Sequence, residues 1–386
     1  RSRNWKEDVK GWIRRDRNHP SVVMWSVGNE NDWPGSEYLL SRYRMLCDAV
    51  RKLDPSRPAM AAAERGGIDN PAAQLHLMTR GVTDFVGCNY SEQWYEDMLA
   101  QDPDILILGT ENFVYFRSNK QEFDSFDEMC PWFDVEKDDR VMGNFLWTGI
   151  DYLGESWGRW PMTGSLAGLM DVTGFDKPVS DFYRTFWKKE QPQVHLCVYR
   201  QSPDHFKDQL LSQWNFPAMD RIWAGEEDAP LYVASYTNCE EVELLLNGRS
   251  LGVQRLSDSP NRILKWAVPF EPGELLAIAR TAGQEVARHA LRTPGAPVAI
   301  RLEAKVPVLS ANEWDTSPVE ATLVDAQGNT CPWQAGSEVS FSVSGTGSLT
   351  AVGNGSLTFH GPFQGDTVPV SNDRCMAYVR AGALKG

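Results

Sequence analysis

The sequence predicts a multidomain chain in which an α/β part is followed by an all-β part. Two observations lead to this division. Up to about residue 188, apolar runs of strand length alternate with helical patterns, which is typical of parallel βα units. From about residue 190, short alternating strands are separated by turn residues, which is typical of β-sandwiches. The 386 residues are enough for two or three domains, each with its own core.

Two amphipathic helices are predicted in the first part. The first covers residues 4–17 and is stopped by Pro20, and its apolar stripe consists of Trp5, Val9, Trp12 and Ile13. The second covers residues 34–53, beginning at Pro34-Gly35-Ser36, with a stripe of Leu39, Tyr43, Leu46, Val50 and Leu53. Tyr95 opens a further helical segment. We expect these stripes to pack on a sheet.

Five segments are predicted as the strands of that sheet, at residues 22–30, 58–63, 85–90, 105–111 and 141–147. The first is an apolar run that ends abruptly in Asn29 and Glu30, and the fourth ends in Glu111. A strand buried on both faces reads as such a run, and the C-terminal ends of parallel barrel strands meet at one mouth. Cleavage of a glycosidic bond needs two carboxyl groups, one to protonate the leaving oxygen and one to attack or to activate water. Glu30 and Glu111 are therefore the candidate catalytic pair.

Four ordered motifs carry a family resemblance. NHPSVVMWSVGNE at residues 18–30 resembles the acid/base signature of glycoside hydrolase family 2, which holds β-galactosidases, β-glucuronidases and β-mannosidases. The similarity continues through DFVGCNY at 84–90, the strand that ends in Glu111, and FLWTGIDY at 145–152. The resemblance implies a partial (β/α)8 TIM barrel holding about strands four to eight, closed by a helix at 181–187. It also implies a retaining reaction with Glu111 as nucleophile and Glu30 as general acid/base.

The resemblance assigns three further residues, and a fourth is suggested by its place on the loop after Trp147. Asn29 and Tyr90 are expected to contact the sugar or the nucleophile, and Trp147 is expected to be a platform for the sugar. Asp151 is expected either to bind a sugar hydroxyl or to cap its loop. For Tyr90 the alternative is a rim aromatic, and for Trp147 it is barrel core. Asn112 follows the nucleophile where the family more usually has tyrosine, so this sequence departs from the family pattern at the position next to Glu111.

Beyond the barrel the sequence predicts two immunoglobulin-like β-sandwiches. We expect domains at 1–189 (partial barrel), 190–296 (first sandwich) and 297–386 (second sandwich, lacking a closing strand). Asn247-Gly248 marks a tight hairpin turn between alternating strands. The segment VELLLNGRSLG at 242–252 resembles the immunoglobulin-like module that follows the barrel in bacterial members of the family.

The motifs favour a retaining exo-β-glycosidase, most similar to a β-galactosidase, because no Asn-x-Lys motif for a substrate carboxylate follows Trp147. A β-glucuronidase or a β-mannosidase is the near alternative. A non-catalytic carbohydrate-binding or adhesin-like protein is the distant one, and it predicts no paired carboxylates at one mouth. We expect residues 1–386 to be the C-terminal part of a longer enzyme, with open barrel edges covered by other segments, and to have little activity alone.

Composition limits the partners. The 38 basic and 52 acidic residues give a net charge of −14. This charge argues against nucleic acid and anionic membranes as partners, whereas it is compatible with a neutral carbohydrate. A homo-oligomer is left open.

No phosphate-binding loop, dinucleotide fingerprint or nucleophile elbow occurs, so we expect no cofactor. No metal ligands are predicted, although a divalent cation held from an earlier strand is left open. The residues from Arg1 to Trp5 contain no apolar core of a signal peptide. The location is therefore left unknown, and a bacterial periplasm or secretion is favoured.

Overall fold

A computed structural model describes residues 4–31, 37–63, 81–120, 126–156, 159–199, 218–334, 336–371 and 373–384. The expected helix start at Pro34-Gly35-Ser36 lies outside these residues. The chain divides into two compact units, the first ending at Thr148 and the second beginning at Gly149. Each unit is described separately.

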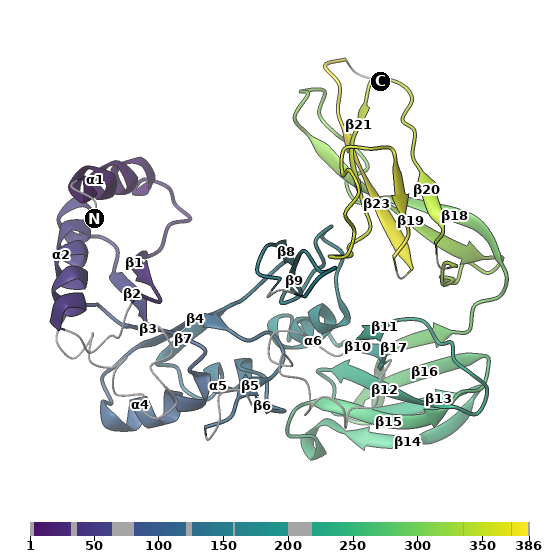
Figure 1. Ribbon diagram of the computed structural model, residues 1–386. Coiled ribbons are helices and arrows are strands. Elements are labelled where there is room, and N and C mark those ends of the chain that lie inside the picture. The colour runs from purple at the N-terminus through teal and green to yellow at the C-terminus, as the bar shows by residue number, and fades with distance from the viewer. Residues whose placement is uncertain are drawn as a thin grey trace. The chain divides into compact units, whose positions relative to one another are not determined.

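The first unit is built on a five-stranded parallel sheet in the order β1-β2-β3-β4-β7 (Figure 1). Its strands are β1 (Trp25–Asn29), β2 (Ala59–Ala63), β3 (Val86–Asn89), β4 (Ile107–Asn112) and β7 (Val141–Leu146). This confirms the fold class that the alternating pattern predicted, with strands neighbouring in sequence lying side by side. Among the described residues, β1 and β7 each pair with one strand only.

Helices cover one face of this sheet. They are α1 (Trp5–Asp16), α2 (Glu37–Leu53), α4 (Tyr95–Gln101) and α5 (Trp132–Val135), with the 3₁₀ helix η1 (Glu92–Trp94) and the short hairpin β5 (Arg117–Ser118) and β6 (Phe126–Asp127) between them. α2 packs along β1 and β2. Ile13 of α1 and Val50 of α2 are fully buried against Trp25 and Ala59. The predicted apolar stripes therefore form the core, as helical periodicity requires.

The strand β1 is shorter and less buried than the apolar run suggested. Its ladder starts at Trp25, whose N–H donates to Pro58 O at 3.0 Å, while Val23 is 63% exposed. The carbonyl of Val22 accepts instead from Arg57 Nε at 2.6 Å. A side chain thus takes the backbone group that a longer strand would need. The expectation of a strand buried on both faces was wrong for this segment, because Trp25 alone of its five residues is buried. Among the described residues β1 pairs with β2 alone.

The second unit contains the hairpin β8 (Tyr152–Leu153) and β9 (Gly164–Ser165), the helix α6 (Pro178–Trp187) and two β-sandwiches. The first sandwich stacks the sheet β11-β10-β12-β15 on the sheet β14-β13-β16-β17 around one apolar core. Its strands are β10 (Val194–Tyr199), β11 (Met219–Asp220), β12 (Pro230–Thr237), β13 (Glu241–Leu246), β14 (Arg249–Arg255), β15 (Ile263–Pro269), β16 (Glu274–Thr281) and β17 (Gln284–Arg292), with the 3₁₀ helix η3 (Leu256–Asp258). Asn247 and Gly248 both have positive φ, which confirms the predicted hairpin turn.

The second sandwich has the sheet β18-β19-β23-β21 and the pair β20-β22. Its strands are β18 (Pro297–Ala304), β19 (Thr316–Asp325), β20 (Glu338–Ser340), β21 (Ser348–Gly353), β22 (Thr367–Pro369) and β23 (Arg374–Arg380). Val339, Val368 and Ala377 form part of its buried core.

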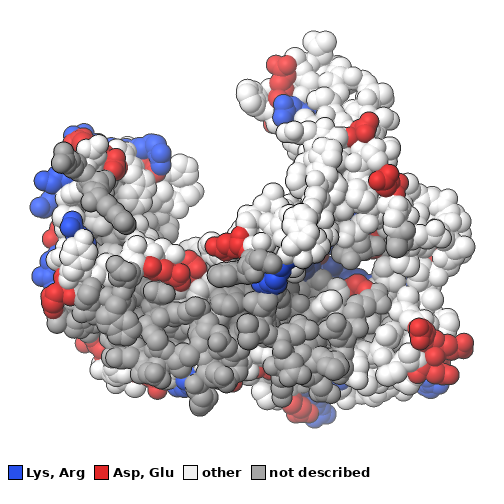
Figure 2. Space-filling model, in the orientation of Figure 1, with Lys and Arg blue, Asp and Glu red and all other residues white. Residues whose placement is uncertain are grey.

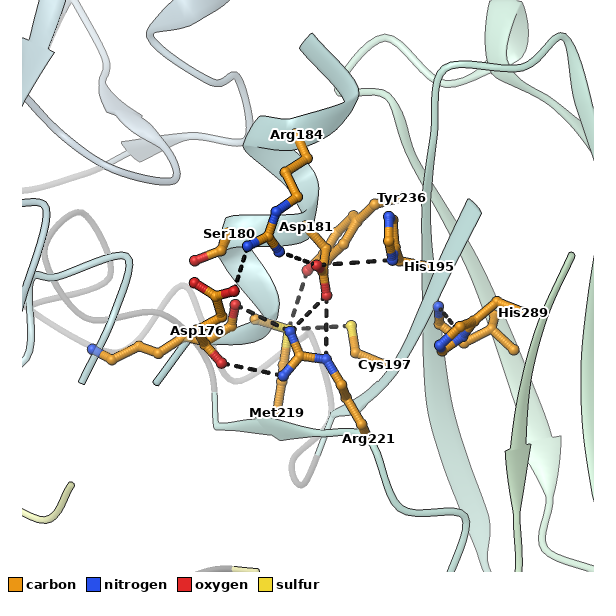
Figure 3. Close-up of polar contacts among 12 residues, drawn as sticks. Asp176, Ser180, Asp181, Arg184, His195, Cys197, Met219, Arg221, Tyr236 and His289 are labelled. Carbon is orange, nitrogen blue, oxygen red and sulfur yellow. Dashed lines mark hydrogen bonds and ion pairs between the residues drawn. The ribbon is translucent and has the colours of Figure 1, made fainter. Parts of the chain in front are cut away.

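The helix α6 is tied to the first sandwich by a cluster of charges (Figure 3). The carboxylate of Asp181 accepts from Arg221 Nη2 at 2.6 Å and from Arg184 Nη1 at 2.6 Å. Nδ1 of His195 in β10 lies 3.8 Å from Asp181 Oδ1. Arg221 also donates to the carbonyl oxygens of Asp176 and Lys177. The helix predicted at 181–187 thus exists, begins three residues earlier and has a charged attachment to β10 and β11.

Three further properties concern the cysteines, the surface charge and the hydrophobicity of the helices. All seven cysteines are buried and none is in a disulfide. On the face shown in Figure 2, blue and red side chains of the described residues are interspersed and neither colour forms a broad patch. No helix in the described part of the chain is long and apolar enough to cross a membrane.

Candidate active site

Glu111 lies near the end of β4 and is held by two neutral donors. Its Oε2 accepts from the Tyr90 hydroxyl at 3.0 Å, and its Oε1 accepts from Asn29 Nδ2 at 3.0 Å. The carboxyl is half-buried. Burial and the negative charge of Glu30 raise the pKa of Glu111, while the hydrogen bonds from Tyr90 and Asn29 act to lower it. The carboxylate is therefore fixed in direction by groups that favour its ionised form.

Glu30 follows β1 directly and is exposed at the same strand ends. Its N–H donates to Ala62 O at 3.1 Å, which continues the ladder by one residue. Its Oε1 accepts from Asn89 Nδ2 at 2.9 Å. Glu30 is thus anchored by backbone and side chain, yet open to solvent and to a substrate.

Asn89, the last residue of β3, joins the two carboxyl groups. Besides Glu30, its Nδ2 donates to Asn29 Oδ1 at 3.0 Å, and Asn29 in turn donates to Glu111. The Thr110 hydroxyl donates to Asn89 Oδ1 at 2.6 Å, which fixes the orientation of the amide. Asn89 is fully buried. Two amides therefore connect Glu30 to Glu111 in one continuous hydrogen-bonded network.

Tyr90 reaches Glu111 because its backbone turns sharply at the end of β3. Its φ is +49°, and its N–H donates to Glu111 O at 2.7 Å. Its ring packs on Phe113 at 4.5 Å between centroids. Glu30 also has positive φ, at +46°. Left-handed conformations are uncommon outside glycine and gather at functional sites, so two at one set of strand ends point to a site.

The two remaining predicted residues lie on different units. Trp147 follows β7 in the first unit, is partly exposed, and donates its N–H to Asn112 O at 2.9 Å. Asp151 belongs to the second unit and is 2% exposed. Its Oδ1 accepts from Lys177 Nζ at 2.6 Å and from Gly168 N at 2.8 Å. The contacts described for Asp151 are therefore those of a buried ion pair, and its role toward a sugar stays a prediction.

Sequence reasoning did not list Asn89 or Thr110 among the site residues. The available signal for Asn89 was that its strand, like that of Asn29, ends in an amide. Thr110 carried no signal, because its partner depends on the register between β3 and β4. No group of three or more His, Cys, Asp or Glu side chains suited to a metal ion occurs within the described ranges.

Comparisons with known proteins identify the family of the chain. The family model "Glycosyl hydrolases family 2, TIM barrel domain" matches residues 2–112, "Glycoside hydrolase family 2 C-terminal domain 5" matches 300–386, and a domain of unknown function (DUF4982) matches 228–287. A solved structure of a glycosyl hydrolase family 2 member from Bacteroides cellulosilyticus aligns with 100% of this chain at 30% identity and a TM-score of 0.86. The chain belongs to glycoside hydrolase family 2.

Two curated relatives of the family bear different names. "Beta-galactosidase BoGH2A" of Bacteroides ovatus is 29% identical over 99% of this chain, and a "Putative beta-glucuronidase" of Formosa agariphila is 28% identical over 85%. The chain spans 49% and 33% of these two proteins, and 49% of the solved family 2 chain. The three family models fall within the expected domains 1–189, 190–296 and 297–386, whose exact bounds remain a prediction.

Proposed function

We propose that the full-length protein is a retaining exo-β-glycosidase in which Glu111 is the nucleophile and Glu30 the general acid/base. The observation that carries this proposal is the link from Glu30 through Asn89 and Asn29 to Glu111. A carbohydrate-binding or adhesin-like protein has no need of two carboxyl groups converging at one set of strand ends. The pair therefore favours an enzyme over that alternative.

The different surroundings of the two carboxyl groups support different roles. Glu111 is half-buried and receives two hydrogen bonds, so its ionised oxygen is aimed at a fixed point, as a nucleophile requires. Glu30 is exposed and receives one described side-chain hydrogen bond, so it is free to exchange protons with a leaving group and with water.

These roles give a balanced two-step reaction. Glu111 forms a bond to the anomeric carbon while the bond to the leaving oxygen breaks and Glu30 gives that oxygen its proton. Glu30, now ionised, takes a proton from water as the water oxygen attacks the same carbon. The bond to Glu111 then breaks, the sugar leaves with its original configuration, and both residues return to their starting states.

For the substrate we propose a terminal β-galactoside. The groups described around Glu30 and Glu111 are amides and a phenol, which suit neutral hydroxyls. The residues after Trp147 are Thr148, Gly149 and Ile150, which provide no cation for a uronate carboxylate. A β-glucuronidase is the second candidate, because one curated relative carries that name.

The test is hydrolysis of a panel of 4-nitrophenyl β-glycosides by the full-length protein, with the anomeric configuration of the product followed by NMR. We expect the galactoside to have the highest kcat/KM, at least about tenfold above the glucuronide and the mannoside, with retention. A preference for the glucuronide would overturn the proposed substrate. Inversion of the anomeric configuration would overturn the retaining mechanism, and a protein that hydrolysed no glycoside would overturn the proposal that it is an enzyme.

A further inference from the structure

A further carboxyl group, that of Glu92, lies behind β4, the strand that carries Glu111. Glu92 begins η1, three residues after the end of β3, and is 1% exposed. Its Oε2 accepts from Asn112 Nδ2 at 3.1 Å. Asn112 is fully buried and directly follows Glu111. Because successive side chains of a strand point to opposite faces, Glu92 holds the end of β4 from the side away from Asn29 and Tyr90.

Asn112 has little freedom to move. Its Nδ2 also donates to the Tyr95 hydroxyl at 3.3 Å. A Cβ added to Gly109 would lie 2.1 Å from Asn112 Oδ1 and 2.6 Å from the Tyr95 hydroxyl, so the absence of a side chain at Gly109 makes room for this contact. The Asn112 carbonyl accepts from Trp147 N at 2.9 Å. A shift of Asn112 would therefore shift both Glu111 and Trp147.

The surroundings of Glu92 suit a neutral carboxyl group. Arg117 of β5 is the nearby cation, but it is paired with Asp134 of α5 at 2.5 Å. Glu92 Oε1 has no hydrogen-bond partner among the described residues. Burial raises the pKa of Glu92 to about 8. The negative charge of Asp134 adds to this rise, while a backbone hydrogen bond at Glu92 and the charge of Arg117 act to lower the pKa. Among the described groups, Cys88 of β3 and Tyr95 of α4 also interact with Glu92, and burial raises the pKa of both.

We propose that Glu92 is a positioning residue, whose buried carboxyl fixes Asn112 and thereby holds Glu111 in line with its donors Tyr90 and Asn29. The proposal rests on Glu111 being the nucleophile.

The test compares Glu92→Gln with Glu92→Leu in the full-length protein. Glutamine keeps an oxygen that accepts from Asn112, whereas leucine keeps a similar volume without an acceptor. We expect Glu92→Gln to retain kcat within about threefold at pH 6 to 7, and Glu92→Leu to lower kcat about 10- to 100-fold with a smaller change in KM. The rate at which a 2-deoxy-2-fluoro-galactoside labels Glu111 should fall in parallel. Glu96→Gln, at a surface pair with Lys137, is the matched control and should leave both rates unchanged.

The melting temperature of Glu92→Leu shows whether its rate falls because the protein unfolds. If Glu92 positions Asn112, kcat falls by more than the fraction of folded protein does at the assay temperature. A Glu92→Leu variant with wild-type kcat, or a Glu92→Gln variant as impaired as Glu92→Leu, would overturn the role of Glu92. An inactive wild-type protein would overturn the proposed function itself, and with it this role. The two failures are thus distinguished by the wild-type rate.

Discussion

The hydroxyl of Tyr90 donates to Glu111 Oε2 at 3.0 Å, and the N–H of the same tyrosine donates to the Glu111 carbonyl at 2.7 Å. One residue therefore positions both the backbone and the side chain of the proposed nucleophile. This double contact depends on the left-handed conformation of Tyr90, which directs its ring back toward β4.

Replacing Tyr90 with Phe should shift the acidic limb of the pH profile. The hydroxyl lowers the pKa of Glu111, so its loss raises that pKa further and ionised nucleophile is lost at a higher pH. We expect the acidic limb of kcat/KM to move up by about one pH unit, since a hydrogen bond to a charged group contributes roughly 1.5–3 kcal/mol and Glu111 is partly exposed. Tyr38→Phe, at an exposed tyrosine of α2, is the control. An unmoved acidic limb in Tyr90→Phe would contradict this account.

Thr110→Val should weaken catalysis by releasing Asn89. The Thr110 hydroxyl is the described donor to Asn89 Oδ1, and a free amide would no longer present its Nδ2 to Glu30 and Asn29 together. We expect kcat/KM to fall about 5- to 20-fold, in line with one lost buried hydrogen bond. Thr110→Ser keeps the hydroxyl and should retain most activity. Equal activities of the valine and serine variants would show that the hydroxyl has no such role.

Trp147→Ala should weaken substrate binding while leaving the fold intact. Trp147 is partly exposed at the end of β7, so its removal leaves no large cavity in the core. We expect KM to rise about tenfold or more through loss of stacking area, with a change in melting temperature of only a few degrees. Trp160→Ala, at a tryptophan that is 77% exposed, serves as control. A melting temperature that collapsed together with activity would favour the core alternative for Trp147.

Asp181→Asn should loosen the attachment of α6 to the first sandwich. Burial raises the pKa of Asp181, but its ion pairs with Arg221 and Arg184 dominate and leave the pKa below its usual value. Its stabilising effect is therefore present above the unfolded pKa of about 4 and is lost as pH falls through the lower folded value. We expect a loss of about 1–3 kcal/mol at pH 7, because Arg221 loses its described ion pair and Arg184 loses one of its two, keeping the pair with Asp176. The free energy of unfolding, measured with urea at pH 7 and at pH 3, tests this expectation. A variant as stable as wild type at pH 7 would contradict it, and so would a difference in free energy between variant and wild type that is as large at pH 3 as at pH 7. Asp258→Asn at an exposed site is the control.

The positions of Glu30 and Glu111 were predictable from the sequence because each apolar run stops at a polar residue, and parallel strands bring such ends together. The start of β1 was not, because Arg57 takes the Val22 carbonyl from 35 residues away. The burial of Glu92 was not either, since Ser91, Glu92 and Gln93 read as a polar loop and are covered only by tertiary packing. The link through Asn89 needs the register of three strands at once, which local patterns do not contain.

The most direct test of the proposed mechanism compares Glu111→Gln with Glu30→Gln in the full-length protein, using an aryl β-galactoside whose leaving group needs no proton. Glu111→Gln should abolish turnover, because no bond to the anomeric carbon can form. Glu30→Gln should still release the aryl group in a burst and accumulate the glycosyl-enzyme, since only the second step needs its base. A burst from the Glu111 variant together with an inert Glu30 variant would contradict the assignment.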